Sequence, residues 1–362
     1  MARTYTGSSN PAPRRRNFSR REAILTWARL SYGFMGRTPD YKAAFMASMP
    51  ANPSLYAPFE ESAKGWYRKY SSQCLFFNHV LINPPVDRNR PVHEVEDVFV
   101  HVVRERDGGI VVSGAKMLAT GSALTHATFV AQNSAVTLDK EKAKDFAIVF
   151  IAPMNAPGVK LICRRSYEQK AHSPFDHPLS SRFDENDAVI VFDNVFIPWE
   201  DVLIYRDPQK ANSFYGESRF VNRFTLQAGS RLLVKLEMIV GMFAKAIATN
   251  GTDSFRGVQA ALGEILAWRN LMQAVTTAMC LDRSQPPAAR SCPRPNLRAR
   301  SRCLLPSAGP RFANCSRSIW LGAFWARPPA IGTSRIPSCV PSSISTIAAR
   351  PAAPRNGSSF SN

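Results

Sequence analysis

The spacing of apolar residues changes twice along this chain of 362 residues. Residues 19–78 have the spacing of amphipathic helices, residues 79–207 alternate with a period of two, and residues 208–282 return to helical spacing. Helices and strands bury different faces, so this order requires separate helical and β layers. The sequence predicts an α+β fold with a helical N-terminal layer, an antiparallel β-barrel or sandwich as middle domain, and a partial C-terminal helical bundle.

The N-terminal layer is predicted to contain three helices. The motif SRRE at 19–22 fits a capping box that begins the first helix. The dipeptide TP at 38–39 fits an N-cap followed by proline at the first helical position, and begins a helix over 40–49. A third helix is predicted over 54–74. Residues 1–18 are polar and arginine-rich, and we predict that they are disordered.

The middle domain is predicted to be a series of short strands. The tripeptide DGG at 107–109 lies between the alternating runs 98–103 and 110–112, which indicates a β-hairpin. Further strands are predicted near 128–131, 146–152, 159–163, 188–192 and 195–197. We expect a polar turn, DEND at 184–187, before the last two strands and a second turn, Asp193-Asn194, between them.

The last 80 residues do not continue the bundle pattern. Two long amphipathic helices are predicted over 221–248 and 255–281, but residues 283–362 hold 12 Pro, 12 Arg and 14 Ser and no Lys, Asp or Glu. Such a segment buries too little apolar surface to offset its ordering entropy. This composition is typical of an out-of-frame reading of GC-rich DNA. We therefore predict a disordered tail caused by a frameshift near Asp282.

The charge of the chain lies at its two ends. The formal net charge of +19 would suit a nucleic-acid-binding protein. Residues 1–21 contribute six Arg and residues 283–362 twelve, which leaves 28 basic against 27 acidic residues over 22–282, a net charge of +1. The body therefore has no basic groove in its composition, and no nucleic-acid partner is predicted.

Cysteine spacing and hydropathy predict no metal site, no disulfide framework and no membrane span. The seven cysteines form no CxxC pair. The chain has no run of 18 apolar residues, and its charged N-terminus lacks the apolar core of a signal peptide. We expect a cytoplasmic protein in which Cys74, Cys163 and Cys280 are small buried hydrophobic residues.

Five sequence blocks occur in a fixed order over roughly residues 20–282. They are GRTPDYKAAF at 36–45, FFNHVLINPPVDR at 76–88, IVVSGAKMLATGSALTHA at 110–127, PLSSRFDENDAVIVFDNVFIPWEDVLIYRD at 178–207 and FRGVQAALGEILAWRN at 255–270. Together they resemble the 4-hydroxyphenylacetate 3-monooxygenase (3-hydroxylase) family, the oxygenase components of two-component, FAD-dependent phenol hydroxylases. The resemblance implies an acyl-CoA-dehydrogenase-like fold, and also that the chain begins late, after an N-terminal truncation.

The resemblance also implies the reaction and its partners. A separate NAD(P)H-flavin reductase would supply reduced FAD, O2 would be the co-substrate, and the intact protein would be a homodimer or homotetramer. The substrate would be a para-substituted phenol, hydroxylated ortho to its hydroxyl group. The loop over 166–178 is shorter than in some 4-hydroxyphenylacetate enzymes, so halophenols or other para substituents stay open.

Three residues are predicted to contact the phenol. A phenolate ring is more reactive than a phenol ring, and a phenol resembles tyrosine, with a pKa of about 10. A cation and hydrogen-bond donors near the oxygen favour the charged form. On the resemblance, Arg37 stabilises the charge, Tyr41 donates a hydrogen bond and His79 is the general base. Asn133 and Ser134 match a second stretch near the substrate.

A second group of residues is predicted to hold FAD. The resemblance implies that the loop Pro85, Val86, Asp87 and Arg88 embraces the flavin together with Thr120. Arginine forms charge-assisted hydrogen bonds to anionic groups, and the threonine hydroxyl is a short donor. The chain has no GxGxxG motif and no P-loop, which fits a flavin held outside a Rossmann sheet.

Simpler interpretations stay open. Arg37 could form a surface ion pair, Tyr41 could pack in the core, His79 could be a buried structural histidine, and Asp87–Arg88 a turn ion pair. For the whole chain, one alternative is an inactive remnant of this fold without a complete flavin site, which would aggregate, bind FAD poorly and hydroxylate nothing. The other is a basic binding protein that acts through its arginine-rich ends.

Overall fold

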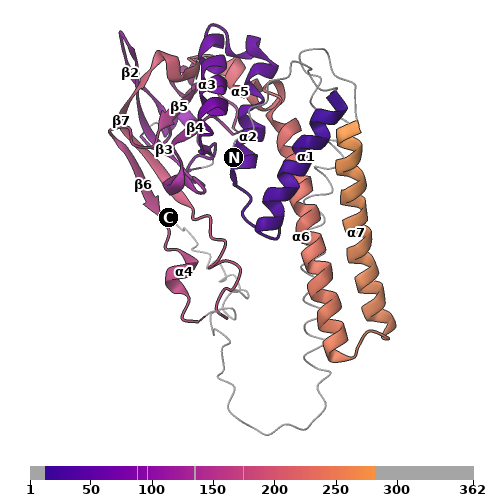
Figure 1. The fold of residues 1–362 in the computed structure, drawn as a ribbon. Helices are drawn as coiled ribbons and strands as arrows, with labels where there is room; N and C mark the ends of the chain where they lie inside the picture. Colours follow the sequence, from indigo (N-terminus) through magenta and orange to yellow (C-terminus); the bar gives the residue numbers. More distant parts are fainter. Residues whose placement is uncertain (1–12, 88, 96, 134–135, 174, 282–362) are drawn as a thin grey trace, which may run out of the picture. The chain divides into compact units, whose positions relative to one another are not determined.

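The computed structural model describes residues 13–281, except for residues 88, 96, 134, 135 and 174 (Figure 1). The predictions for residues 1–12 and 283–362 lie outside the described residues. The helices are α1 (Pro13–Leu30), α2 (Pro39–Met46), α3 (Glu60–Gln73), α4 (Tyr167–Lys170), α5 (Pro208–Glu217), α6 (Phe220–Asn250) and α7 (Arg256–Leu281). The strands are β1 (Phe77–Val80), β2 (His101–Arg106), β3 (Gly109–Lys116), β4 (Ala127–Val130), β5 (Val149–Pro153), β6 (Val159–Cys163), β7 (Ala188–Pro198) and β8 (Val202–Ile204).

The strands form two four-stranded sheets. One has the order β1-β4-β5-β8 and the other the order β2-β3-β7-β6. Every pair is antiparallel except β1 and β4, which run parallel. The predicted DGG hairpin is confirmed as β2–β3. The domain is a sandwich of two sheets. The prediction that all its strands are antiparallel is wrong at the pair β1–β4. A parallel pair needs a crossover connection, and the 46 residues between the end of β1 and the start of β4 are enough for one.

The predicted turn at Asp193-Asn194 is absent, because β7 runs unbroken through these residues. Asn194 has a left-handed φ of 52°, and the ladder with β3 shifts by one residue at this point, between Val112 and Gly114. An irregularity of this kind bends a strand without ending it. The prediction of a turn between two strands is therefore wrong, and Asp193-Asn194 forms an irregularity within one strand.

The sheet β1-β4-β5-β8 is buried on both faces. On one face its side chains pack with those of the second sheet, for example Val80 and Phe150 with Ile190. On the other face Phe77 and Phe129 join the aromatic core of α2 and α3. Side chains alternate along a strand, so His79 lies on the same face of β1 as Phe77 and faces the helical layer.

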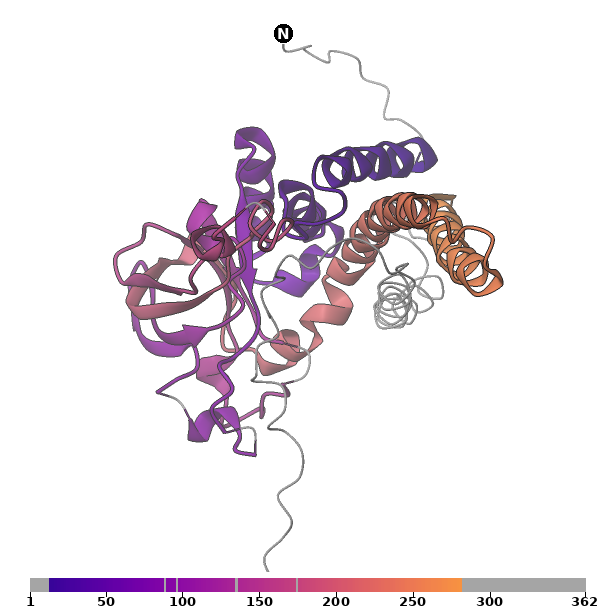
Figure 2. The same ribbon diagram turned by 90° about the horizontal axis from the view of Figure 1, so that it is seen from below.

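Helix α6 connects the layers. Its N-terminal part packs on α2, and further along it contacts α1 and α7 (Figure 2). Two predictions for α1 are wrong: residues 13–18 are helical, and Ser19 lies inside the helix and is not its N-cap. Pro13 takes the first helical position, so the helix begins six residues before the predicted cap.

The three body cysteines do not share one environment, so the prediction that all are buried is wrong for two. Cys74 is exposed and ends α3 with a left-handed φ of 50°, and Cys163 is exposed at the end of the edge strand β6. Cys280 is buried beside Ile24 and Leu226, and burial raises the pKa of its thiol to about 11. A thiol with that pKa stays neutral at physiological pH.

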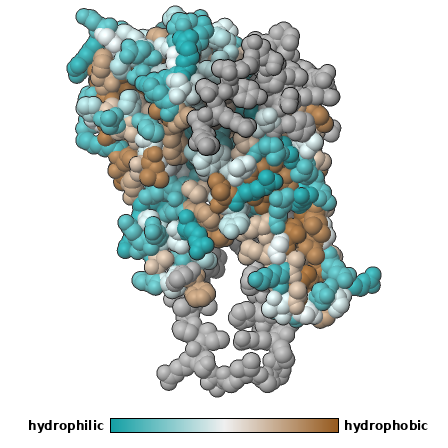
Figure 3. All heavy atoms as spheres, in the orientation of Figure 1, coloured by the Kyte–Doolittle hydropathy of each residue, from teal (hydrophilic) through white to brown (hydrophobic). Residues whose placement is uncertain are grey.

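Apolar side chains remain exposed on the long helices. Met242 on α6 and Leu266 and Leu271 on α7 are exposed, and apolar residues gather over this pair of helices in Figure 3. Within the described residues, no helix has both the length and the apolar character needed to cross a membrane.

Gly33 fixes the chain between α1 and α2. Its φ is +78°, and a Cβ at this position would lie 2.7 Å from the carbonyl oxygen of Arg231 and 2.7 Å from the amide nitrogen of Lys235. These are backbone atoms of α6, so they cannot move aside cheaply. The close approach sets where the next residues, which include Arg37, enter α2.

We predict that Gly33→Ala destabilises the protein by about 2–5 kcal/mol, from left-handed strain and overpacking together. The control is Gly65→Ala in α3, where a Cβ meets nothing within 4 Å. Removing a helical glycine there stabilises by about 0.5–1 kcal/mol. Urea unfolding of both variants measures the difference, and equal midpoints would contradict the role of Gly33.

Candidate functional site

Arg37 and Tyr41 lie at the start of α2, as the sequence predicts. Thr38 is the N-cap and Pro39 occupies the first turn. Arg37 lies in the turn directly before this cap, and its guanidinium lies over the Tyr41 ring, 4.6 Å from its centroid. Tyr41 is buried, which raises the pKa of its hydroxyl group, while the Arg37 charge opposes that shift. The hydroxyl is therefore a hydrogen-bond donor at neutral pH.

His79 reaches the same site from β1. Its ring stacks on Tyr41 with a centroid distance of 5.5 Å and lies 6.2 Å from the Phe45 ring. Phe220 of α6 closes the aromatic shell from another side. The structure therefore brings together all three residues predicted to contact a phenol, from segments 38 residues apart along the chain.

Lys42 is a site residue that the sequence did not predict. Its side chain is 1% exposed, and its Nζ is hydrogen-bonded to His79 Nδ1. Burial lowers the pKa of His79 well below its usual value, and the Lys42 and Arg37 charges lower it further. Burial and Arg37 likewise lower the pKa of Lys42, while Glu185 opposes this. The sequence offered one indication of this residue: Lys42 lies in the apolar run YKAAFM, and lysine is rarely buried unless it has a partner.

The polar turn at 184–187 connects two parts of the site. The Glu185 carboxylate accepts hydrogen bonds from the backbone N–H groups of Gly36 (2.8 Å) and Arg37 (2.5 Å). The next residues bind the Thr120 segment: Asp187 Oδ1 accepts from Thr120 Oγ1 at 2.5 Å, and the Asn186 carbonyl accepts from the Gly121 N–H. A single turn therefore positions both the start of α2 and the loop after β3.

Asp184 holds this turn in place. Its carboxylate accepts hydrogen bonds from the Arg164 guanidinium at 2.5 and 3.2 Å and from the backbone N–H groups of Tyr167 and Asn186 at 2.9 Å. The hydrogen bond to Arg164 is the main cause that lowers the pKa of Asp184 to about 2. The carboxylate is therefore charged throughout the physiological range.

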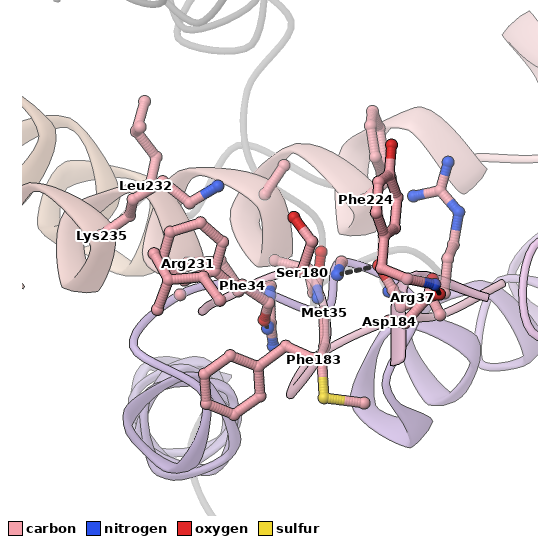
Figure 4. Close-up of a pocket in the computed structure, with 17 residues that line it drawn as sticks. Phe34, Met35, Arg37, Ser180, Phe183, Asp184, Phe224, Arg231, Leu232 and Lys235 are labelled. Atoms are coloured by element: carbon pink, nitrogen blue, oxygen red, sulfur yellow. Dashed lines mark hydrogen bonds between the residues drawn. The ribbon is translucent and has the colours of Figure 1, made fainter. Parts of the chain in front are cut away.

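A pocket of about 490 Å³ lies between α6, the segment before α2 and the loop that ends at Glu185 (Figure 4). Its charged lining residues are Arg37, Asp184, Glu185, Arg231 and Lys235, and aromatic rings from several elements complete it, namely Phe34, Tyr167, Phe183 and Phe224. Arg37, Tyr41 and His79 together are called the phenol cluster below. Arg37 also lines this pocket, whereas Tyr41 and His79 do not.

A buried polar network supports the pocket floor. Arg231 of α6 donates to Thr38 Oγ1 and to Ser31 Oγ, both at 3.0 Å, and to the Phe34 carbonyl. Asp40 accepts a 3.0 Å hydrogen bond from Gln227. These hydrogen bonds join α6 to the segment before α2 and to the start of α2, and such bonds are strong in a low-dielectric interior. Arg231 is another residue absent from the sequence predictions, because its partners lie about 200 positions earlier.

The two segments predicted to hold FAD begin side by side. Ile82 and Met117 form an antiparallel bridge, with a 2.9 Å hydrogen bond from the Met117 N–H to the Ile82 carbonyl. Lys116, which is buried and not predicted, donates to Asn83 Oδ1 at 2.7 Å and Gln132 Oε1 at 3.1 Å. Burial lowers the pKa of Lys116 to about 7. The Lys116 side chain therefore links the end of β3 to the loop at 83–87 and to Gln132, which precedes Asn133.

The individual predicted residues differ in their placement. Pro85, Val86 and Asp87 are exposed, and Asp87 Oδ1 accepts a hydrogen bond from the Asn89 N–H. Thr120 is partly buried, and Asn133 is partly buried beside Gln132. Arg88 and Ser134 lie outside the described residues, so their predicted roles stay predictions.

We predict that Asp184→Asn lowers the free energy of unfolding at neutral pH, because it removes the charge that pairs with Arg164. The loss is limited to roughly 1–2 kcal/mol, because solvent partly screens this pair. The folded pKa of Asp184 is about 2, below the usual value near 3.9, so its contribution is complete above pH 4 and is lost as the pH falls towards 2. Urea unfolding at pH 6 and pH 3 measures this. The exposed Asp193→Asn is the control, and a pH-independent difference for Asp184→Asn would contradict the assignment.

Comparisons with known proteins agree with this arrangement. The family described as 4-hydroxyphenylacetate 3-hydroxylase N terminal matches residues 13–204, and its C-terminal counterpart matches residues 211–330. The second match continues past the described residues, and the frameshift prediction for that segment stays a prediction.

Two curated relatives share 56% of the aligned residues with this chain. The pyoverdin chromophore biosynthetic protein PvcC of Pseudomonas aeruginosa is 56% identical over 274 residues, 76% of this chain and 55% of that protein. A 4-hydroxyphenylacetate 3-monooxygenase oxygenase component of the same organism is 56% identical over 262 residues, 72% of this chain and 50% of that protein. The chain spans about half the length of these relatives.

Solved structures confirm the fold class. The oxygenase component HpaB of 4-hydroxyphenylacetate 3-monooxygenase, complexed with FAD and 4-hydroxyphenylacetate, superposes with a TM-score of 0.80 and 29% identity, over 90% of this chain and 69% of that one. An acyl-CoA dehydrogenase of Slackia heliotrinireducens shares the fold at a TM-score of 0.53 and 16% identity. On the family match and the identity to its relatives, the chain belongs to the 4-hydroxyphenylacetate 3-hydroxylase family.

Proposed function

We propose that this chain carries the phenol site of the oxygenase component of a two-component, FAD-dependent monooxygenase. The reaction is hydroxylation of a para-substituted phenol ortho to its hydroxyl group. The observation that carries the proposal is the meeting of Arg37, Tyr41 and His79 in one cluster between α2 and β1. A cation, a neutral hydroxyl donor and an imidazole at one point are the groups that a phenolate oxygen requires.

The residues predicted to hold FAD fit a flavin. The segments around 82–87 and 117–120 are joined by the Ile82–Met117 bridge and lie at the surface. They carry the exposed apolar side chains Val86 and Leu118, which suit one face of a planar ring, while Thr120 adds a hydroxyl. Arg88 would bind an anionic part of the cofactor. FAD, reduced by a separate NAD(P)H-flavin reductase, would supply with O2 the oxygen atom that is transferred.

The chain's own residues would bind and polarise the substrate. Arg37 sets a positive charge beside the phenol oxygen, and Tyr41 donates a hydrogen bond to it; both lower the pKa of the bound phenol. The aromatic shell of Phe45, Phe220 and His79 excludes water, which strengthens these interactions. A phenolate held this way has an electron-rich ring at its ortho carbon.

The names of the relatives support the substrate class. They include 4-hydroxyphenylacetate, 4-nitrophenol and 3-chloro-4-hydroxyphenyl monooxygenases, all of which act on a phenol with a para substituent. We accordingly infer a para-substituted phenol for this chain, with Asn133 and Ser134 near it, and a cytoplasmic homo-oligomer as the working assembly.

The direct test is an assay of the 362-residue chain with a flavin reductase, NADH, FAD and 4-hydroxyphenylacetate. Formation of the catechol supports the proposal. A chain that binds the phenol but produces no catechol under these conditions would instead be the inactive remnant of the fold. A chain that binds neither phenol nor FAD would contradict the proposed function.

We predict that Arg37→Met weakens phenolate binding roughly 10- to 150-fold, since a hydrogen bond to a charged group contributes about 1.5–3 kcal/mol. Less bound phenolate leaves more reduced flavin to release hydrogen peroxide. Phenol titration and hydrogen peroxide formed per reduced FAD measure both effects. The control is Arg68→Met, an exposed arginine of α3. Unchanged binding and coupling in Arg37→Met would remove Arg37 from the site.

We also predict that His79→Ala reduces hydroxylation much more than it reduces FAD affinity, because His79 faces the phenol cluster and not the flavin segments. His79 is predicted to be the general base, and loss of such a group costs roughly 10²–10⁴-fold in rate. Catechol formation and flavin titration separate the two effects. A variant that keeps the parental rate would exclude His79 from the reaction.

A further inference from the structure

The contact between Lys42 and His79 determines which nitrogen of the His79 ring carries the proton. Lys42 Nζ is hydrogen-bonded to His79 Nδ1, and Nε2 has no hydrogen-bond partner among the residues that the structure describes. A neutral imidazole has one N–H and one bare nitrogen. The role of Nδ1 towards Lys42 therefore fixes whether Nε2 is a donor or an acceptor.

Lysine is the donor in this pair. An ammonium group has three N–H donors and no acceptor, whereas a neutral imidazole nitrogen can take either role. Opposite an ammonium group, which has no acceptor, Nδ1 accepts the hydrogen bond, and the proton of the neutral ring is on Nε2.

The burial of Lys42 also needs an explanation. The side chain lies in the aromatic interior between α2 and β1, where a leucine or methionine would avoid the cost of burying an ammonium group. Its Nζ is hydrogen-bonded to the imidazole of His79. A lysine at this position is explained if its donor acts on His79.

We propose that Lys42 is a positioning residue that holds His79 in the Nε2–H tautomer, so that His79 donates a hydrogen bond to the phenolate oxygen and does not take the phenol proton. This inference rests on the proposed function and revises one part of it, the role of His79 as general base. Three donors, from Arg37, Tyr41 and His79, then surround one oxygen. The phenol proton leaves to water when the substrate binds.

The tautomer is measured without substrate or flavin. Long-range proton–nitrogen NMR spectra of the 362-residue chain distinguish the protonated ring nitrogen, and His79→Ala identifies the His79 signals among the six histidines. We expect Nε2–H in the parent, a shift towards Nδ1–H in Lys42→Met, and retention of Nε2–H in Lys42→Arg, which keeps a donor. An Nδ1–H tautomer in the parent, or an unchanged spectrum in Lys42→Met, would overturn the proposal.

A binding experiment separates this inference from the proposed function. 4-Nitrophenol absorbs differently as phenol and as phenolate, so its titration reports which form is bound. We expect Lys42→Met to bind the phenolate about 10- to 100-fold more weakly, and Lys42→Arg and the exposed control Lys144→Met to match the parent. If Lys42→Met binds the phenolate as tightly as the parent, the proposed role of Lys42 is wrong and the proposed function is unaffected. If the parent shows the Nε2–H tautomer but binds no phenol, the proposed function is wrong and the tautomer assignment is unaffected.

Discussion

The burial of one sheet on both faces is the constraint on which the site depends. Strands β4 and β5 are buried on each side, and the sheet β1-β4-β5-β8 is covered both by the second sheet and by α2 and α3. His79 is the polar exception on the helical face of β1. Its position in a nearly dry interface gives it a low pKa, a stacked Tyr41 ring and a buried lysine as partner. The same packing that stabilises the fold therefore sets the chemistry of the cluster.

A second level of organisation comes from the polar turn at 184–187. Asp184 anchors the turn to Arg164, Glu185 binds the backbone N–H groups before α2, and Asp187 binds Thr120. The turn thus fixes Arg37, which belongs to the proposed phenol site, relative to Thr120, which belongs to the proposed flavin site. Correct separation of the two sites would depend on these charge-assisted hydrogen bonds, because they join segments that are not covalent neighbours.

The sequence predicted what local signals determine. The helix start at Thr38-Pro39, the DGG hairpin and the two long helices each follow from a few adjacent residues. The meeting of Arg37, Tyr41 and His79 was available only through the resemblance. Lys42, Lys116 and Arg231 were not predicted, since a buried cation is recognised by partners that lie 16 to 200 positions away. The parallel β1–β4 pair and the unbroken β7 also depend on long-range pairing.

The central claim is that Arg37, Tyr41 and His79 surround a phenol oxygen, and a crystal structure of this chain with 4-hydroxyphenylacetate tests it most directly. We expect that the phenol oxygen lies within about 3.2 Å of His79 Nε2, with the Tyr41 hydroxyl and the Arg37 guanidinium as its other neighbours. A substrate whose carboxylate faces Arg37 while its phenol oxygen points away from His79, or one bound outside this cluster, would contradict the account.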